Sequence, residues 1–249
     1  YEARMALEQA QKILEQKNAD LENLLHMLSH DLRAPLVNLE GYNAELSLLL
    51  KDWAHNPSDP HLLEEITLAQ SFLNSATQRM GSVIAGALKL SRLSRTPLIP
   101  AIADMNHIVR ECVKTLNFQI QEKQAHISVG LLPTCKGDAG LLGQIFMNLL
   151  DNAMKYHGTH PPRVEIDGRR EAAWSVYKIR DYGPGIPDNY YPNLFKPFHR
   201  LNADSNIRGE GLGLALVKRM AELMHGRIEA RAPADHLGGI EFSLYLPCS

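Results

Sequence analysis

Leucine recurs at every seventh position at the start of the chain. Leu7, Leu14, Leu21 and Leu28 stand at this spacing among Glu, Gln, Lys and Asn residues. Positions seven apart fall on one face of a helix, so this repeat predicts the seam of a coiled coil. The helical pattern continues and stops near residues 56–60, where Asn, Pro, Ser and Asp form a turn signal. We therefore expect one long helix up to that turn.

A second helical pattern runs from about His61 to Leu93 and ends at a break over residues 94–100. Two long helices joined by a short turn carry more apolar surface than a hairpin can bury by itself. Pairing two hairpins into a four-helix bundle would bury it, so the pattern predicts a homodimer. A two-helix arm that packs on the rest of the same chain is the alternative.

From about Ala101 the pattern changes to β-like runs that alternate with helices. Helices are expected at roughly 106–123 and 139–156, and strands over 125–131, 163–167, 174–180, 227–232 and 240–246. This alternation predicts an α/β sandwich, in which helices stack on one face of a mixed sheet. We therefore expect two domains, residues 1–96 and residues 97–249.

The composition limits the class of protein. Of the 249 residues, 22% are charged and 45% are hydrophobic, which is typical of a soluble globular protein. The net charge of -2 offers no electrostatic reason to bind nucleic acid. The three cysteines are scattered without a C-x-x-C pair, which favours a reducing compartment and no disulfide or zinc framework.

The start of the chain indicates a piece of a longer protein. No apolar run reaches the roughly 18 residues that span a bilayer. Because the chain starts at Tyr1 inside a helical pattern, we expect a fragment. Separately, we expect this fragment to be cytoplasmic. Whether the parent protein has a sensor domain upstream or a membrane anchor is left open.

One histidine in the first helix stands out as a candidate nucleophile. His30 lies two residues from both Leu28 and Leu32 of the apolar stripe, about 200° round the helix, and is predicted to face outward. Pro35 cannot donate to the carbonyl of Asp31 and is expected to bend the helix one turn later. Neutral imidazole is a nitrogen nucleophile near pH 7, and Asp31 could orient the ring and take its proton. An ordinary surface histidine is the alternative.

Two asparagines mark the end of the helix expected at 139–156. Asn148 and Asn152 are four residues apart and therefore share one helical face. Their amide oxygens are hard ligands that suit Mg²⁺, which keeps waters and bridges to phosphates. Lys155 could meet phosphate charge, and Tyr156 could line a nucleotide cavity. An amphipathic helix with capping asparagines is the alternative.

A strand ends at an acidic, glycine-rich turn. Asp181 follows the expected strand, and a carboxylate there can accept a hydrogen bond from the exocyclic amine of adenine, where guanine presents a carbonyl. Gly183 and Gly185 permit close approach of the backbone. Turns with this pattern are common after strands, so by itself it is a weak signal.

A second glycine-rich stretch opens the last helical pattern. Gly209, Gly211, Leu212 and Gly213 lead directly into it. Glycines before a helix leave free N–H groups and the positive end of the dipole for phosphate. No Gly-Lys-Ser or Gly-Lys-Thr ending follows, so this stretch is not a P-loop.

Taken in this order, the four blocks resemble the sensor histidine kinases of two-component signalling, over nearly the whole chain. The resemblance implies a long helical hairpin in a dimeric four-helix bundle, followed by an α/β sandwich of the histidine kinase/gyrase-type ATPase fold. Residues 1–96 would form the dimerisation and histidine phosphotransfer domain, and residues 97–249 the catalytic ATP-binding domain.

The resemblance also implies a function for single residues. The kinase would use ATP and Mg²⁺, phosphorylate itself on His30 with the help of Asp31, and pass the phosphoryl group to an aspartate of a response regulator receiver domain. Asn148 and Asn152 would be the metal ligands. The implied nucleotide-binding residues are Asn148, Asn152, Lys155, Tyr156, Asp181, Gly183, Gly185, Gly209, Gly211, Leu212 and Gly213.

Three positions depart from the family pattern, and one of them is Leu141, which stands where the family usually has Arg three positions after Asp138. Ala34 stands where the family often has Thr or Asn to position water for dephosphorylating the partner, so the resemblance does not extend to phosphatase activity. Glu210 stands where the family often has Ser or Thr, and an acid near a triphosphate is unfavourable unless it points away.

Two other functions are compatible with part of the sequence. A gyrase-type ATPase shares the last three blocks but leaves the block around His30 unexplained. A scaffold that binds nucleotide poorly and signals through its coiled coil is the second. The residue types do not indicate the input signal, the cognate regulator, or whether phosphate passes within or between subunits.

Overall fold

The structure is a computed structural model that describes residues 2–93, 98–197, 211–235 and 238–249. Side chains are described for these residues apart from 2–3, 6–10, 12–27, 30–31 and 90–92. The chain divides into two compact units, residues 1–91 and residues 92–249.

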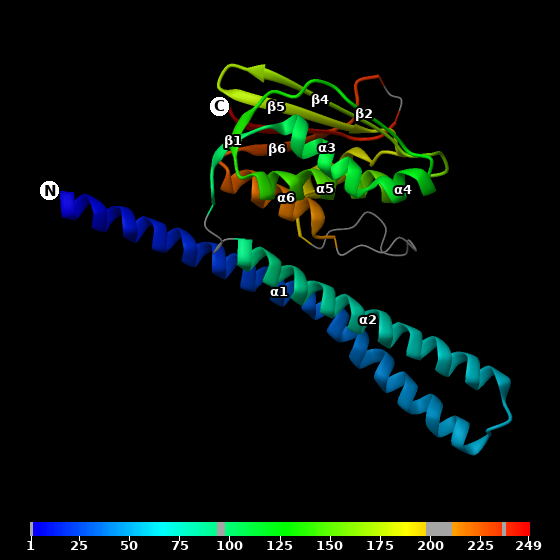
Figure 1. The fold of residues 1–249 in the computed structure, drawn as a ribbon. Helices are drawn as coiled ribbons and strands as arrows, with labels where there is room; N and C mark the ends of the chain where they lie inside the picture. The colour runs from blue at the N-terminus through cyan, green and yellow to red at the C-terminus, as the bar shows by residue number, and fades with distance from the viewer. Residues whose placement is uncertain (1, 94–97, 198–210, 236–237) are drawn as a thin grey trace. The chain divides into compact units, whose positions relative to one another are not determined.

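The first unit is a hairpin of two helices, as the leucine pattern predicts (Figure 1). Helix α1 (Glu2–His55) continues through Pro35, and helix α2 (Pro60–Leu93) begins after a short turn. Asp59 helps to start α2, because its Oδ1 accepts a hydrogen bond of 2.9 Å from the N–H of His61. Neither these helices nor any other in the described part of the chain is long and apolar enough to cross a membrane.

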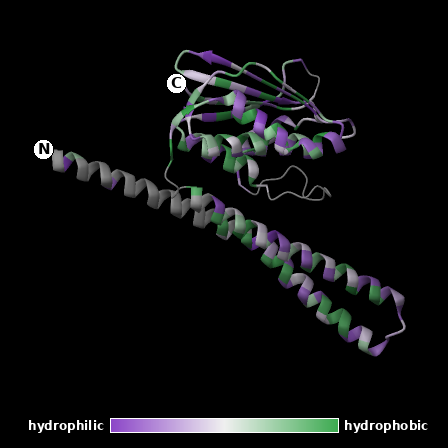
Figure 2. Ribbon diagram, viewed as in Figure 1, coloured by the Kyte–Doolittle hydropathy of each residue, from purple (hydrophilic) through white to green (hydrophobic). Residues whose placement is uncertain are grey.

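The two helices of the hairpin meet along small and aromatic residues. Ala69, Ala76 and Val83 of α2 are buried and stand seven residues apart, as in the seam of a coiled coil. Tyr42 of α1 stacks on Phe72 of α2, with ring centroids 4.6 Å apart. Hydrophobic residues nevertheless recur along the coloured parts of both helices (Figure 2), and many of them are exposed. The large apolar side chains that are exposed on the two helices are Met5, Leu36, Val37, Leu48, Leu50, Trp53, Leu63, Leu68, Phe72, Ile84 and Leu88.

The second unit is an α/β sandwich, so this part of the predicted fold is confirmed. Its main sheet has the strand order β2-β4-β5-β7-β6, in which only β2 and β4 are parallel. The strands are β2 (His126–Val129), β4 (Arg163–Glu171), β5 (Trp174–Asp181), β6 (Arg227–Arg231) and β7 (Glu241–Pro247). The helices on one face of this sheet (Figure 1) are α3 (Met105–Thr115), α4 (Asn117–Glu122), α5 (Ala139–Lys155) and α6 (Gly213–Leu223).

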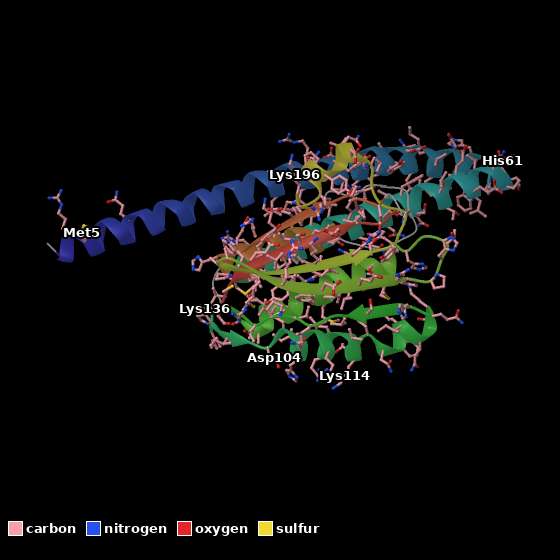
Figure 3. All side chains as sticks on the ribbon, turned by 90° about the horizontal axis from the view of Figure 1, so that it is seen from above. Met5, His61, Asp104, Lys114, Lys136 and Lys196 are labelled. Atoms are coloured by element: carbon pink, nitrogen blue, oxygen red, sulfur yellow. The ribbon has the colours of Figure 1, made fainter. Side chains whose placement is uncertain are left out.

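Three details of this unit differ from the sequence prediction. The helix expected at 106–123 is divided at Leu116 into α3 and α4; Figure 3 shows Asp104 and Lys114 near the two ends of α3. Two strands were missed, β1 (Ala101–Ala103) and β3 (Cys135–Gly137), which pair antiparallel with each other. Three residues are too few to show a period. Strand β4 also runs on to Glu171 through a polar stretch, because pairing with β5 extends it.

The core fixes α5 against the centre of the sheet. Phe146 of α5 meets Tyr177 of β5 edge to face, with ring centroids 6.2 Å apart, and both side chains are fully buried. Leu142, Ile145 and Leu149 extend this apolar face of the helix. The opposite face of α5 is therefore free to carry polar side chains toward a ligand.

Candidate functional site

The start of α5 is held firmly by its cap. Asp138 Oδ1 accepts hydrogen bonds from the N–H groups of Gly140 and Leu141, and Oδ2 accepts one of 3.0 Å from Ile99. Burial raises the pKa of Asp138, but the backbone hydrogen bonds outweigh it and the pKa lies below its ordinary value. A charged cap of this kind defines where the helix begins and thus where its later residues point.

The two asparagines of α5 face the first residue of α6. A methyl group placed on Gly213 would stand 3.1 Å from Asn148 Oδ1 and 4.0 Å from Asn152 Oδ1. Asn148 Nδ2 donates a hydrogen bond of 2.8 Å to the carbonyl of Gln144, which leaves its oxygen toward Gly213. The structure therefore brings two amide oxygens to the N-terminus of another helix, a pairing that suits a metal next to a phosphate.

The N-terminus of α6 is not capped by its own side chains. Leu212 occupies the N-cap position, is buried, and makes no side-chain cap hydrogen bond. Gly211 has a positive φ of 68°, which glycine adopts easily. The first N–H groups of α6 and its positive dipole end are thus suited to an anionic ligand.

The far end of α5 meets the turn after β5. A side chain on Gly183 would stand 2.6 Å from the carbonyl oxygen of Tyr156, so only glycine fits there. Asp181 Oδ1 accepts hydrogen bonds of 3.0 Å from Gly183 N–H and 3.3 Å from Ile240 N–H. One helix therefore spans the site, with its body beside Gly213 and its end beside Asp181.

Asp181 lies in a largely desolvated position. Burial raises the pKa of Asp181 above its ordinary value, while the N–H groups of Gly183 and Ile240 and the charge of Arg180 oppose that rise. Both hydrogen bonds recorded among the described residues reach Oδ1. Oδ2 is the oxygen that a ligand amine would use.

A glycine pair before β7 supports this turn, and the sequence analysis missed it. Gly239 has a φ of 85°, and a methyl group on it would stand only 1.9 Å from the carbonyl oxygen of Asp181. Gly185, with a φ of 73°, lies against the backbone of Gly239. The signal available in the sequence was the adjacent pair Gly238-Gly239 directly before an expected strand.

Lys155 and Tyr156 lie at the end of α5, at the edge of the site. Lys155 Nζ is paired with Asp151 Oδ2 at 2.5 Å, on its own helix. Tyr156 is 42% exposed. An exposed ion pair within a helix contributes little to stability. Lys155 could therefore leave Asp151 and bind a phosphate at little cost in free energy.

Other predicted site residues lie outside the described part of the structure. The backbone of His30 and Asp31 belongs to α1, but their side chains are outside the described residues, as are Gly209 and Glu210. Among the described side chains, no group of three or more His, Cys, Asp or Glu residues could hold a metal ion. A metal at Asn148 and Asn152 would thus depend on amide oxygens and on the ligand.

Comparison with known proteins places this geometry in context. Residues 137–249 match the family described as histidine kinase-, DNA gyrase B-, and HSP90-like ATPase. The chain is 30% identical over 217 residues to the methanogenesis regulatory histidine kinase FilI of Methanothrix harundinacea. The resemblance to sensor histidine kinases is confirmed. The match covers 86% of this chain but only 23% of FilI, so the chain spans about a quarter of that relative.

Solved histidine kinase structures share the fold. Full-length ShkA in complex with AMPPNP superposes with a TM-score of 0.56 at 26% identity, covering 74% of this chain and 39% of ShkA. ThkA in complex with the response regulator protein TrrA gives a TM-score of 0.61 at 17% identity, covering 94% of this chain and 64% of that one. The second unit is therefore a histidine kinase-type ATPase domain that follows a helical region.

Proposed function

We propose that this chain is the core of an ATP-dependent protein-histidine kinase, which phosphorylates itself on His30 and passes the phosphoryl group to an aspartate of a response regulator. One observation carries the nucleotide part of the proposal. The oxygens of Asn148 and Asn152 approach the start of α6 at Gly213, where no described side chain caps the helix, while the end of α5 contacts the turn after Asp181. The groups that would hold the metal, donate hydrogen bonds to phosphate and accept a hydrogen bond from adenine thus lie around one site.

Each part of the site has its own binding task. Asp181 accepts a hydrogen bond from the exocyclic amine of adenine, and the glycine turn at Gly183 and Gly185 lets the base approach. Asn148 and Asn152 hold Mg²⁺ through their amide oxygens. Phosphate oxygens are bound by the stretch that opens α6, which comprises Gly209, Gly211, Leu212 and Gly213.

Two residues at the end of α5 complete the site. Lys155 binds phosphate in exchange for its ion pair with Asp151, and Tyr156 lines the cavity. When bound, Mg²⁺-ATP supplies the transferable phosphoryl group and the metal charge that offsets the phosphates.

The residues of the hairpin would carry out the transfer. His30 attacks the γ-phosphorus with its unprotonated ring nitrogen, a P–N bond forms, and the bond to the ADP oxygen breaks. Asp31 accepts the proton that the ring loses. The carboxylate of a receiver aspartate then attacks the phosphorus and the P–N bond breaks. The ring takes the proton back from Asp31, which restores neutral imidazole.

The exposed apolar side chains of the hairpin support a homodimer. Leu48, Leu63 and Leu68 are each more than half exposed, although an isolated hairpin in water gains nothing from exposing them. A second hairpin would bury them in a four-helix bundle. Sedimentation equilibrium tests this part of the proposal, and a chain that stays monomeric at micromolar concentration would contradict it.

The partner and the setting follow from the same proposal. The solved complex of ThkA with a response regulator protein supports a receiver domain as the partner. An input domain would lie upstream in the parent protein, and this part would act in the cytoplasm. Ala34 lacks the polar group that would position water, so we expect weak phosphatase activity toward that partner.

Incubation with radiolabelled ATP tests the kinase. We expect a protein-bound label that resists base and is lost in acid, and we expect His30→Gln to abolish it. His61→Gln is the matched control, because His61 is an exposed histidine of the same hairpin (Figure 3). Label that persists in His30→Gln, or that survives acid, would contradict the proposed site.

A further inference from the structure

Two of the three cysteines stand directly opposite each other in the second unit. Cys135 and Cys248 form an isolated antiparallel β-bridge, although they are far apart in the sequence. Opposite residues of an antiparallel pair have Cα atoms about 4.5–5.5 Å apart and side chains on the same side. A disulfide requires a Cα separation of about 4.4–6.8 Å, so this backbone pairing suits one.

The surroundings of the two thiols differ. Cys135 is completely buried, and this burial raises its pKa. Cys248 is partly exposed, and its Sγ lies 3.6 Å from Ser175 Oγ and 3.8 Å from the carbonyl of Ala172. Cys248 is therefore the thiol that a small reagent in water reaches first.

One serine links the neighbourhoods of both cysteines. Ser175 Oγ contacts Cys248 Sγ and donates a hydrogen bond of 2.7 Å to the carbonyl of Thr134, the residue before Cys135. The strand that carries Cys135 and the strand end that carries Cys248 are thus already held together in the reduced protein. Little backbone movement separates the thiol pair from a bond.

We propose that Cys135 and Cys248 form a reversible disulfide when the protein meets a peroxide. The Cys248 thiolate attacks one peroxide oxygen, the O–O bond breaks, the first water leaves, and Cys248 becomes a sulfenic acid. Cys135 Sγ then attacks the Cys248 sulfur, the S–O bond breaks, and the second water takes the proton of Cys135. Two thiols lose two electrons and two protons in total, and one hydrogen peroxide becomes two waters.

The bond would lock a strand that leads into the nucleotide site. Cys135 belongs to β3, and α5 begins two residues after that strand, at the cap Asp138. Cys248 follows β7 directly, and Figure 1 marks the C-terminus at the end of the sheet beside β1, the partner of β3. The disulfide therefore closes a long loop that contains α5, β4, β5 and α6, and long loops gain most from closure.

Cys112 provides a matched control within the chain. It is a buried cysteine of α3 whose Sγ contacts the carbonyl of Gly143 at 3.5 Å. Cys112→Ser removes one thiol of the same unit without removing either proposed partner. Cys248→Ser removes the partly exposed partner, and Cys135→Ser removes the buried one.

Oxidation of the full chain tests the proposal. After hydrogen peroxide treatment and blocking of the remaining thiols with N-ethylmaleimide in denaturant, we expect intact mass to show two fewer adducts per monomer than in the untreated chain, together with the loss of about 2 Da that one disulfide gives. Peptide mapping should link Cys135 to Cys248, and dithiothreitol should reverse the change. The oxidised chain should melt at least about 5 °C higher than the reduced one. Cys112→Ser should behave like the wild type, and Cys248→Ser should show none of these changes.

Three results would overturn the proposal. The first is a peptide link that includes Cys112, and the second is a link between two chains. The third is over-oxidation of Cys248 while Cys135 remains a free thiol. If Cys135→Ser fails to fold, Cys248→Ser still decides the outcome, because its side chain lies at the surface. Kinase activity is not part of the measurement, so the result is independent of the proposed function.

Discussion

A single methyl group at Gly183 should separate the two sides of the nucleotide site. In Gly183→Ala the new Cβ would stand 2.6 Å from the carbonyl oxygen of Tyr156, whereas ordinary contacts begin at 3.4 Å. The turn and the end of α5 must move apart by about 0.8 Å, the difference between these two distances. The same methyl would stand 3.2 Å from Asp181 Oδ1 and press on the carboxylate.

This displacement gives the magnitude of the effect. The hydrogen bond from Gly183 N–H to Asp181 Oδ1 measures 3.0 Å, and the carboxylate must shift from this position because the new methyl would stand 3.2 Å from the same oxygen. A hydrogen bond to a charged group contributes about 1.5–3 kcal/mol, and about 1.4 kcal/mol changes a dissociation constant tenfold. If Asp181 reads adenine, Gly183→Ala should weaken AMPPNP binding about 10- to 150-fold, as measured by isothermal titration calorimetry.

Gly143→Ala is the control for this experiment. Gly143 lies in the same helix α5, and nothing lies within 4 Å of a methyl group placed on it. Alanine favours a helix over glycine by about 1 kcal/mol, so this variant should melt higher and bind AMPPNP normally. Wild-type affinity in Gly183→Ala, to within a factor of two, would refute the reasoning. Equal loss of affinity in both variants would refute it as well.

Four further predictions concern three side chains. Acid should weaken AMPPNP binding as Asp181 loses its charge, and the loss should begin at a higher pH than for an ordinary aspartate, because burial raises its pKa. Since the folded pKa exceeds the unfolded one, the stability that this group contributes is lost as pH rises through the folded value. As pH rises, the free energy of unfolding of Asp181→Asn should therefore increase relative to that of the wild type. A difference in denaturation midpoints that does not change with pH would contradict this. Asn152→Ala should remove the Mg²⁺-dependent part of AMPPNP affinity, and an equal loss with and without EDTA would argue against a metal ligand. Tyr191→Phe should raise the free energy of unfolding by about 1 kcal/mol, because the Tyr191 hydroxyl is buried without a partner among the described residues; lower stability in urea would count against that.

Local pattern was enough to predict the long elements. The structure has α2 over Pro60–Leu93 and α5 over Ala139–Lys155, within a residue of the predicted bounds. Each has an apolar face at helical spacing and a clear start after an aspartate. The pattern failed at β1 and β3, which have three residues each, and at Leu116, where a short change of direction ends α3 without proline or glycine.

The sequence alone indicated which chemical groups the site would contain. That Asn148 and Asn152 share a helical face follows from their spacing, because helical geometry acts over a few residues. That this face meets Gly213 does not follow from spacing. It depends on α5 and α6 packing on one common core, which includes Leu149 and Val217.

The same distinction holds for contacts between distant segments. Gly239 lies beside Asp181 only because strands β5 and β7 pair. Cys135 lies opposite Cys248 only because the short strand β3 meets the end of β7. Periodicity and turn residues are local preferences, so they can be read from the chain. Burial of the apolar faces of the helices and the sheet determines which distant residues become neighbours, so only the tertiary structure revealed these contacts.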